Sequence, residues 1–580
     1  MEFGRALASY RPMIRILGRN AARLTHLAVL WLFLFTVGTA FADNSKISPD
    51  LLPLLSNPNT QVNVIIQYNA SQPVVTCTSG GLLGLGGLLC TVVNVLGGVV
   101  NFALSLINSV AATLTAGDVI TTSNQSNVNY ISLDRSVSPM LDYTAAAVNA
   151  QFAWASSLDG SGVGIAIIDS GIDSHPDLNV PFSTRSRVLY HQSFVKGVQF
   201  DDYGHGTHVA GIAAGNGSSS SGPGAFRTFK GIAPNANLID LRVLDVNGKA
   251  TDSAVIAAIQ QAVSLKSKYN IRVINLSLGR PIYESCTRDP LCQAVEMAWK
   301  NGIVVVTAAG NLGRNGYATI LSPGNSPHAI TVGCMKTMAT YPNSDDRIAS
   351  YSSRGPSYID LTVKPDIVAP GNLVDSLLAP GSTLAAQYPA NVVASSQYTT
   401  AAPSGGPSYF TLSGTSMSTP VVSGTVALML QRNPSLTPDT IKARLMKTAS
   451  KAFPVSSTAT DPTTGVTYTD TYDIFTVGAG YLNIQGALTD TDVANQSAAS
   501  PYATYNPATN QAYLTLNNSS IWGNSAVWGT SAVWGTAVLL NGTSAVWGTS
   551  AVWGTSAVWG TSAVWGTSAV WGTTSGIGEH

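Results

Sequence analysis

Between residues 150 and 450 the chain alternates two hydrophobic patterns. Short apolar runs bounded by glycine or polar residues are typical of buried strands in a parallel sheet. Longer segments with apolar residues every three or four positions are typical of helices. We predict strands at residues 163–169, 237–243, 272–277, 302–308 and 328–333, and helices at 206–215, 251–267, 288–301, 417–432 and 438–448. This alternation predicts an α/β fold in three layers, with helices covering both faces of a mostly parallel sheet.

Two further segments of this region carry local signals. Thr437 and Pro438 form a strong helix start, with the threonine as N-cap and the proline at the first helical position. Residues 371–412 are rich in Ser, Ala, Pro and Gly. We therefore expect surface loops at 371–412.

Residues 43–140 have a different pattern, which predicts a small α+β domain. Strands are expected at 62–68 and 127–134, with a strand-to-helix stretch at 106–120 between them. Residues 80–107 are apolar and uncharged, and this run is long enough to cross a bilayer. Its seven glycines weaken that interpretation. We interpret it as an apolar insertion, with a membrane-active or membrane-spanning segment as the alternative.

Three short motifs follow one another in a fixed order and place polar side chains at the ends of predicted elements. IAIIDSGID (165–173) places Asp169 at the end of a buried strand, HGTHVAG (205–211) places His205 at the start of a helix, and SGTSMSTP (413–420) places Ser416 at the start of another. Open α/β sheets bind ligands at the carboxyl ends of their strands. We expect the three side chains to converge there.

This combination suits nucleophilic attack on an acyl group. A serine hydroxyl needs a base to take its proton, and a neutral histidine has a suitable pKa. A buried carboxylate fixes the histidine tautomer and stabilises the imidazolium that forms. The N-terminus of a helix offers backbone N–H groups to an oxyanion, and Asn311, just after the predicted strand 302–308, is a candidate second donor.

Together with NLSLG (275–279) and AAGN (308–311), these motifs resemble the signature segments of the subtilase family of serine endopeptidases, over about residues 155–450. The resemblance implies a subtilisin-like fold in which Asp169, His205 and Ser416 form the catalytic triad and Asn311 donates to the oxyanion. It also implies two walls for the primary substrate pocket: Ser277, Leu278 and Gly279 on one side, and Ala308, Ala309 and Gly310 on the other.

The same resemblance implies the organisation of the whole chain. Residues 43–140 would be an inhibitory propeptide that templates a slowly folding catalytic domain and blocks its cleft until cut, so that the enzyme is a self-processed zymogen. The catalytic domain would cover 141–490, after a junction near 130–150, and 491–580 would be a linker and repeat tail. The substrates would be polypeptides, and the small pocket residues predict broad tolerance with some favour for apolar or aromatic side chains.

Each motif also has a purely structural interpretation. An aspartate after an apolar strand is often a turn former, Asn311 is a possible cap, and His205 taken alone is compatible with a structural histidine. We assign His208, three residues further on, to packing. The combination of the motifs, rather than any single residue, favours catalysis.

Charge and the N-terminal segment limit the location and partners of the protein. Lys plus Arg and Asp plus Glu number 30 each and only 10% of residues are charged, which argues against a nucleic-acid partner. A basic segment, an apolar run at 27–37 and Ala-Phe-Ala at 40–42 are typical of a secretory signal, residues 1–42. The run is shorter than the roughly 20 residues of a membrane anchor. We predict a secreted protein, with association with a cell surface left open.

The five cysteines are compatible with export. Cys286 and Cys292 flank a short loop and favour a local disulfide. Cys77 and Cys90 are a candidate second pair, and Cys334 would remain as a buried thiol.

Eight of the eleven tryptophans lie between Trp522 and Trp571, mostly in a repeated SAVWGT hexapeptide that is interrupted at 537–542. The period predicts either a short-repeat β structure or a partly disordered tail. Exposed tryptophans of this kind favour binding to carbohydrate, to a cell surface or to the tail itself.

Two alternative functions, adhesion and ester hydrolysis, are compatible with parts of the sequence, and calcium is a candidate ligand. An adhesive protein acting through its tail, with a vestigial protease fold, is disfavoured by the intact triad and cleft motifs. An esterase or lipase is disfavoured because Ser416 lacks the second glycine of G-x-S-x-G and follows the histidine in the sequence. The chemistry requires no cofactor. Structural calcium is common in the family, but no D-x-[DN]-x-[DN]-G spacing is present, so metal binding stays open.

Overall fold

A computed structural model describes residues 43–48, 51–69, 98–104, 109–133, 141–196, 200–400, 406–461, 464–506, 511–515, 537–539 and 579. The chain divides into two compact units, residues 1–137 and 138–580. The expected signal segment, the cysteines at 77 and 90, and the tryptophan repeats lie outside the described residues.

The first unit contains a four-stranded antiparallel sheet in the order β2-β3-β1-β4. Its elements are β1 (Gln61–Tyr68), β2 (Val99–Leu104), β3 (Ser109–Thr115), α3 (Ala116–Ser123) and β4 (Val128–Leu133), preceded by the short 3-10 helices η1 (Asn44–Lys46) and η2 (Leu52–Ser56). Alternate residues of β1, beginning with Val62, are buried, as a strand with one face on a core requires. Over the described residues, the strands predicted at 62–68 and 127–134 and the strand-to-helix stretch at 106–120 are confirmed, while residues 106–108 and 134 lie outside the described part of the chain.

Residues 99–104 of the apolar run at 80–107 form the edge strand β2 of this sheet, and residues 80–97 and 105–107 lie outside the described part of the chain. No helix among the described residues has the length and apolar character that crossing a membrane requires.

The second unit is built on a sheet in the order β11-β10-β9-β8-β5-β7-β6, with β12 beside β10. The strands are β5 (Gly164–Asp169), β6 (Val188–Ser193), β7 (Asn237–Arg242), β8 (Ile271–Leu276), β9 (Val304–Ala308), β10 (Ile330–Lys336), β11 (Arg347–Ile348) and β12 (Ile367–Pro370). All pairs are parallel except β10 with β11. The predicted mostly parallel sheet is confirmed.

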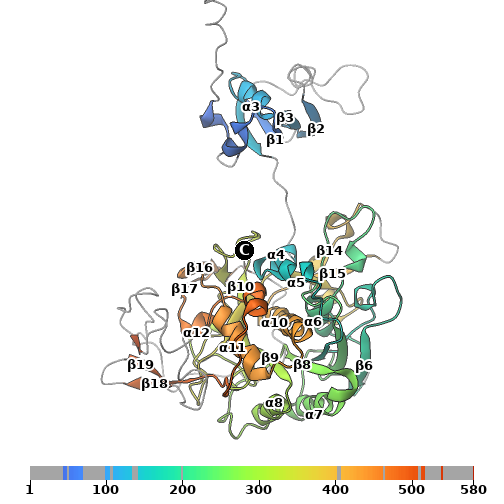
Figure 1. Ribbon diagram of the computed structural model, residues 1–580, viewed down its shortest axis with the longest axis vertical. Helices are drawn as coiled ribbons and strands as arrows, with labels where there is room; N and C mark the ends of the chain where they lie inside the picture. Colours follow the sequence, from blue (N-terminus) through green and yellow to red (C-terminus); the bar gives the residue numbers. More distant parts are fainter. Residues whose placement is uncertain are drawn as a thin grey trace, which may run out of the picture. The chain divides into compact units, whose positions relative to one another are not determined.

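Helices cover both faces of this sheet. Side chains alternate across β5, so that Ile165 and Ile167 join the hydrophobic core on the side of α6 (His205–Ala214) and α10 (Thr415–Arg432). Ala166 and Ile168 join a second core beneath α7 (Asp252–Tyr269) and α8 (Pro290–Lys300), which lie side by side (Figure 1). The three-layer α/β architecture follows from this alternation.

The predicted helices and strands of this unit are present, with ends that differ by at most three residues from those expected. The helix at 438–448 is α11 (Pro438–Thr448), and the Thr437 hydroxyl caps it by accepting from the Thr440 N–H at 3.2 Å. The unit also contains short helices: α4 (Leu141–Ala147), α5 (Ala150–Ala155), α12 (Ile474–Val477) and α13 (Ile484–Thr489).

The expectation of surface loops at 371–412 is wrong in part. This segment contains β13 (Val374–Leu377), α9 (Thr383–Gln387), β14 (Val392–Val393) and β15 (Tyr409–Leu412), and all four residues of β13 are buried. The strands form a small antiparallel sheet in the order β13-β15-β14. Strands of two to four residues are too short to produce a periodic signal in the sequence.

Packing of the second unit continues beyond residue 490. Ala498 and Ala503 are part of its hydrophobic core. The buried Ser500 hydroxyl donates to Asp366 at 2.6 Å and accepts from Lys442 at 2.7 Å. Three short strands follow, namely β18 (Tyr502–Asn506), β19 (Gln511–Thr515) and β20 (Ala537–Leu539).

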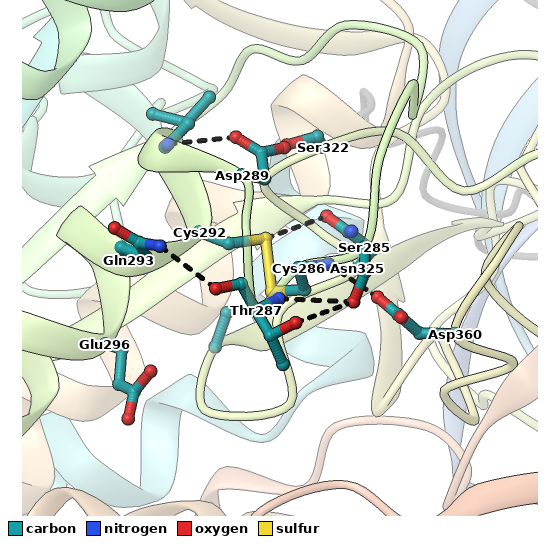
Figure 2. The surroundings of a disulfide bond; sticks show 12 residues. Ser285, Cys286, Thr287, Asp289, Cys292, Gln293, Glu296, Ser322, Asn325 and Asp360 are labelled. Carbon is teal, nitrogen blue, oxygen red and sulfur yellow. Dashed lines mark hydrogen bonds between the residues drawn. A yellow bond between two sulfur atoms is a disulfide. The ribbon is translucent and has the colours of Figure 1, made fainter.

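The predicted disulfide between Cys286 and Cys292 is present and joins the loop before α8 to the first turn of that helix (Figure 2). Between the two cysteines, Asp289 caps α8 by accepting from the Leu291 N–H at 2.9 Å. Cys334 is a free, fully buried thiol, as expected, and burial raises its pKa to about 12.

Candidate active site

Asp169 and His205 form a buried, hydrogen-bonded pair. Asp169 ends β5 and His205 begins α6, and Nδ1 of the imidazole lies 2.7 Å from Oδ1 of the carboxylate. Neither side chain is exposed to solvent. The close approach of α6 depends on Gly206, where a Cβ atom would lie 2.2 Å from the backbone oxygen of Gly171. This contact holds the imidazole in one orientation.

A second polar layer holds this pair in place. The Ser170 hydroxyl donates to Asp201 at 2.7 Å and accepts from the Gly206 N–H at 2.8 Å, while Asp201 also accepts from the Thr207 N–H at 2.8 Å. Burial raises the pKa of Asp201 to about 6, against the lowering effect of these hydrogen bonds. Sequence reasoning gave neither Ser170 nor Asp201 a role in the site, although Ser170 lies within the 165–173 motif and Asp201 lies four residues before His205.

The electrostatic surroundings of His205 favour its protonated form. Burial alone lowers the pKa of the imidazole, but the charge of Asp169, its hydrogen bond and the charge of Asp201 together outweigh burial and raise it. The second ring nitrogen, Nε2, is buried and has no hydrogen-bond partner among the residues that the structure describes. It is the atom that a general base would use.

Ser416 lies in the first turn of α10, and α10 packs against α6. Its hydroxyl donates to the backbone oxygen of Ser277 at 3.1 Å, and within the described residues it forms no hydrogen bond with Nε2 of His205. Catalytic hydrogen bonds often tighten only when substrate is bound. A rotation about the Cα–Cβ bond of Ser416 is enough to release this contact with Ser277.

Asn311 follows β9 and is fixed by Thr415, the residue before Ser416. Its amide oxygen accepts from the Thr415 N–H at 3.0 Å and from the Thr415 hydroxyl at 3.1 Å. The same hydroxyl accepts from the Gly310 N–H at 3.1 Å. Because the oxygen is engaged in this way, the amide NH₂ is the end that can serve as a donor. Thr415 was not identified as a site residue from the sequence.

The two predicted pocket walls meet at one side chain. A Cβ atom at Gly279 would lie 2.9 Å from Cβ of Leu321, and one at Gly310 would lie 2.7 Å from its Cγ. Leu278 belongs to the core beneath α7 and α8, and the Ser277 side chain is fully buried. Ala308 ends β9, and Ala309 is buried beside it.

His208 has the packing role assigned to it. Its Nε2 lies 3.1 Å from the Val374 oxygen and 2.9 Å from the Phe410 oxygen, which belong to β13 and β15. Burial, followed by the charge of His205, lowers its pKa to about 3. Within the described ranges, no group of three or more His, Cys, Asp and Glu residues is placed to hold a metal ion.

Comparison with known proteins matches residues 160–523 to the model of the Subtilase family. The chain is 40% identical to Serine protease AprX of Bacillus subtilis over 333 residues, which are 55% of this chain and 69% of that protein. It is 34% identical to Subtilisin E of the same organism over 61% of this chain and 78% of that protein.

The chain is also similar to a third protease sequence and to a solved structure. The chain is 35% identical to the Alkaline protease of Alkalihalobacillus alcalophilus over 56% of this chain and 69% of that protein. Among solved structures, it is similar to a cold adapted subtilisin-like serine proteinase, with 28% identity over 50% of this chain and 84% of that one and a TM-score of 0.37.

Proposed function

Because the chain belongs to the subtilase family and is a serine endopeptidase, we propose that it is secreted as a zymogen, processes itself, and cleaves polypeptides through an acyl-enzyme. The observation that carries the mechanism is the buried Asp169–His205 pair, in which Nδ1 is bound to the carboxylate and Nε2 is left unengaged among the described residues.

In the first step of this mechanism, Ser416 attacks the carbonyl carbon of the substrate peptide. Its hydroxyl leaves the backbone oxygen of Ser277 and gives its proton to Nε2 of His205. Asp169 keeps the accepting nitrogen in place and stabilises the imidazolium ion. The raised pKa of His205 makes it a stronger base than a free imidazole.

The negative charge on the tetrahedral intermediate needs fixed donors. We assign them to the Asn311 amide NH₂ and to the backbone N–H of Ser416 in the first turn of α10. The two hydrogen bonds from Thr415 to the Asn311 oxygen support this role, because they orient the amide before substrate arrives.

His205 then protonates the departing amine, which leaves the acyl group on Ser416. A water molecule attacks this ester while Nε2 takes its proton. The second tetrahedral intermediate then collapses, Nε2 returns the proton to the Ser416 oxygen as its bond to the acyl carbon breaks, and the carboxylic acid is released. We assign the primary pocket to Ser277, Leu278 and Gly279 with Ala308, Ala309 and Gly310. No cofactor takes part in these steps.

The compact first unit supports the propeptide role, in which residues 43–140 act as the intramolecular inhibitor. The Cys286–Cys292 disulfide supports export, because disulfides persist in oxidising compartments. In this proposal residues 1–42 are a signal peptide, 141–490 form the main part of the catalytic domain, and 491–580 form the tail.

Expression of the wild-type chain and of Ser416→Ala in a secreting host tests the proposal. The wild type should be released with a new N-terminus near residues 130–150, while Ser416→Ala should retain the first unit. Identical processing of the two proteins would contradict self-maturation, and retention of both inside the cell would contradict export.

A further inference from the structure

Glu579, which follows the tryptophan repeats, is buried in the second unit with an exposed fraction of 2%. Its carboxylate lies 2.7 Å from Nη2 of Arg314 and 3.2 Å from Nζ of Lys336. It also accepts from the Ser350 N–H at 3.1 Å and from the Ser350 hydroxyl. Four donor groups from three residues, all more than 220 positions away in the chain, therefore converge on one carboxylate.

The backbone of Glu579 is bound as well. The side chain of Asn372 accepts from its N–H at 3.0 Å and donates to its carbonyl oxygen at 2.7 Å. An asparagine that bonds to both backbone groups of one residue holds any peptide, whereas the Arg314, Lys336 and Ser350 groups require a carboxylate. The site thus recognises an acidic residue within a polypeptide.

The charges around this site require an anion. Arg314 also pairs with Asp461, but Lys336 is only 3% exposed, and Glu579 is the one carboxylate within 4 Å of its ammonium among the described residues. Burial alone raises the pKa of Glu579, but hydrogen bonds from Ser350 and Arg314 outweigh it and lower the pKa. A buried ammonium left without its partner is strongly destabilising.

The site adjoins the segment that carries the nucleophile. Asn372 stands between Gly371, whose oxygen accepts from the Gly414 N–H at 2.9 Å, and Leu373, whose N–H donates to the Ser413 hydroxyl at 2.8 Å. These partners lie two and three residues before Ser416 in the sequence. The two neighbours of Asn372 are therefore each hydrogen-bonded to a residue that lies just before α10.

We propose that Arg314, Lys336, Ser350 and Asn372 form a docking site for Glu579 of the same chain, which fastens the far end of the repeat tail to the catalytic unit. The second unit then binds the chain on both sides of the repeats, at Tyr502 of β18, which forms a β-bridge with Thr362, and at Glu579. The structure identifies Glu579 as the occupant, because both its side chain and its backbone are bound in the site.

Hydrogen exchange on the full-length chain tests the proposal, in a Ser416→Ala background that prevents self-cleavage. Glu579→Gln should speed exchange of the Ser350 and Leu373 amides by roughly tenfold, because the charged acceptor and the support of Asn372 are lost. Amides in β5, such as that of Ile167, should exchange unchanged, which separates local release from global unfolding. The matched control is Glu296→Gln, a surface residue 39% exposed and paired with Lys300.

Equal exchange at Ser350 and Leu373 in the Glu579→Gln and Glu296→Gln proteins would overturn the proposal. If Glu579→Gln does not fold, Glu579→Asp decides: it keeps the charge but shortens the side chain by one methylene, and the same two amides should exchange faster. Sedimentation of the Ser416→Ala chain at several concentrations should show a monomer. A dimer that Glu579→Gln abolishes would show docking between two copies and would overturn docking within one chain.

Discussion

Ser277 and Ser416 hold each other by two reciprocal hydrogen bonds. The Ser416 hydroxyl donates to the Ser277 carbonyl at 3.1 Å, and the Ser277 hydroxyl donates to the Ser416 carbonyl at 2.8 Å. The second bond has a local cause. Pro420, four residues after Ser416 in α10, has no N–H for that carbonyl, and the Ser277 side chain supplies the missing donor.

Substitution of Ser277 by alanine should therefore disturb both stability and turnover. It leaves the buried Ser416 carbonyl without this donor, at a cost of roughly 1–3 kcal/mol in unfolding free energy. Because the first turn of α10 is loosened, kcat should fall more than KM rises. Thermal denaturation and steady-state kinetics measure both effects, with the exposed Ser264→Ala as the control. Unchanged melting and kcat would show that the reciprocal pair has no role.

The pH dependence of activity should follow the raised pKa of His205. The base must be neutral to accept the Ser416 proton, so kcat/KM is lost as pH falls through the pKa of the imidazole in the free enzyme. Asp169 and Asp201 raise this pKa, which places the acid limb above the value of about 6.5 of a free histidine. A pH profile of peptide hydrolysis checks this, and an acid limb clearly below that value would contradict it.

Replacement of Asn311 by alanine should reduce kcat while KM changes little, because the donor acts mainly on the intermediate. The expected loss is about 10² to 10³, the size found for the corresponding kind of donor in subtilisin itself. The exposed Asn315→Ala, four residues further along the chain, serves as the control. If Asn311→Ala keeps wild-type kcat, the oxyanion assignment is wrong.

Truncations should separate proteolysis from adhesion. A chain that stops after Asn506 should still hydrolyse a soluble peptide, although the loss of Glu579 should lower its melting temperature. A chain that stops at residue 490 should fail to fold, because it lacks Ser500, which bonds to the buried Asp366 and Lys442. If the first truncation is folded but inactive, the tail rather than the catalytic unit carries the activity.

The sequence predicted those parts of the structure that depend on local patterns. Buried parallel strands, amphipathic helices and the Thr437 cap leave periodic or positional signals, and the Asp169 and His205 motifs lie at the ends of such elements. The short strands β13 to β15 gave no such signal. The role of Ser277 and the burial of Glu579 were also missed, because their partners lie 139 or more residues away in the chain.

The central claim is that Ser416, His205 and Asp169 act as one catalytic unit. Turnover of a soluble peptide by the wild type, Ser416→Ala, His205→Ala and the double variant tests it most directly. Each single substitution should reduce kcat by about 10⁶, the loss observed for the triad of subtilisin, and the double variant should lose no more than either single one. Wild-type turnover by Ser416→Ala, or losses that add up in the double variant, would contradict the claim.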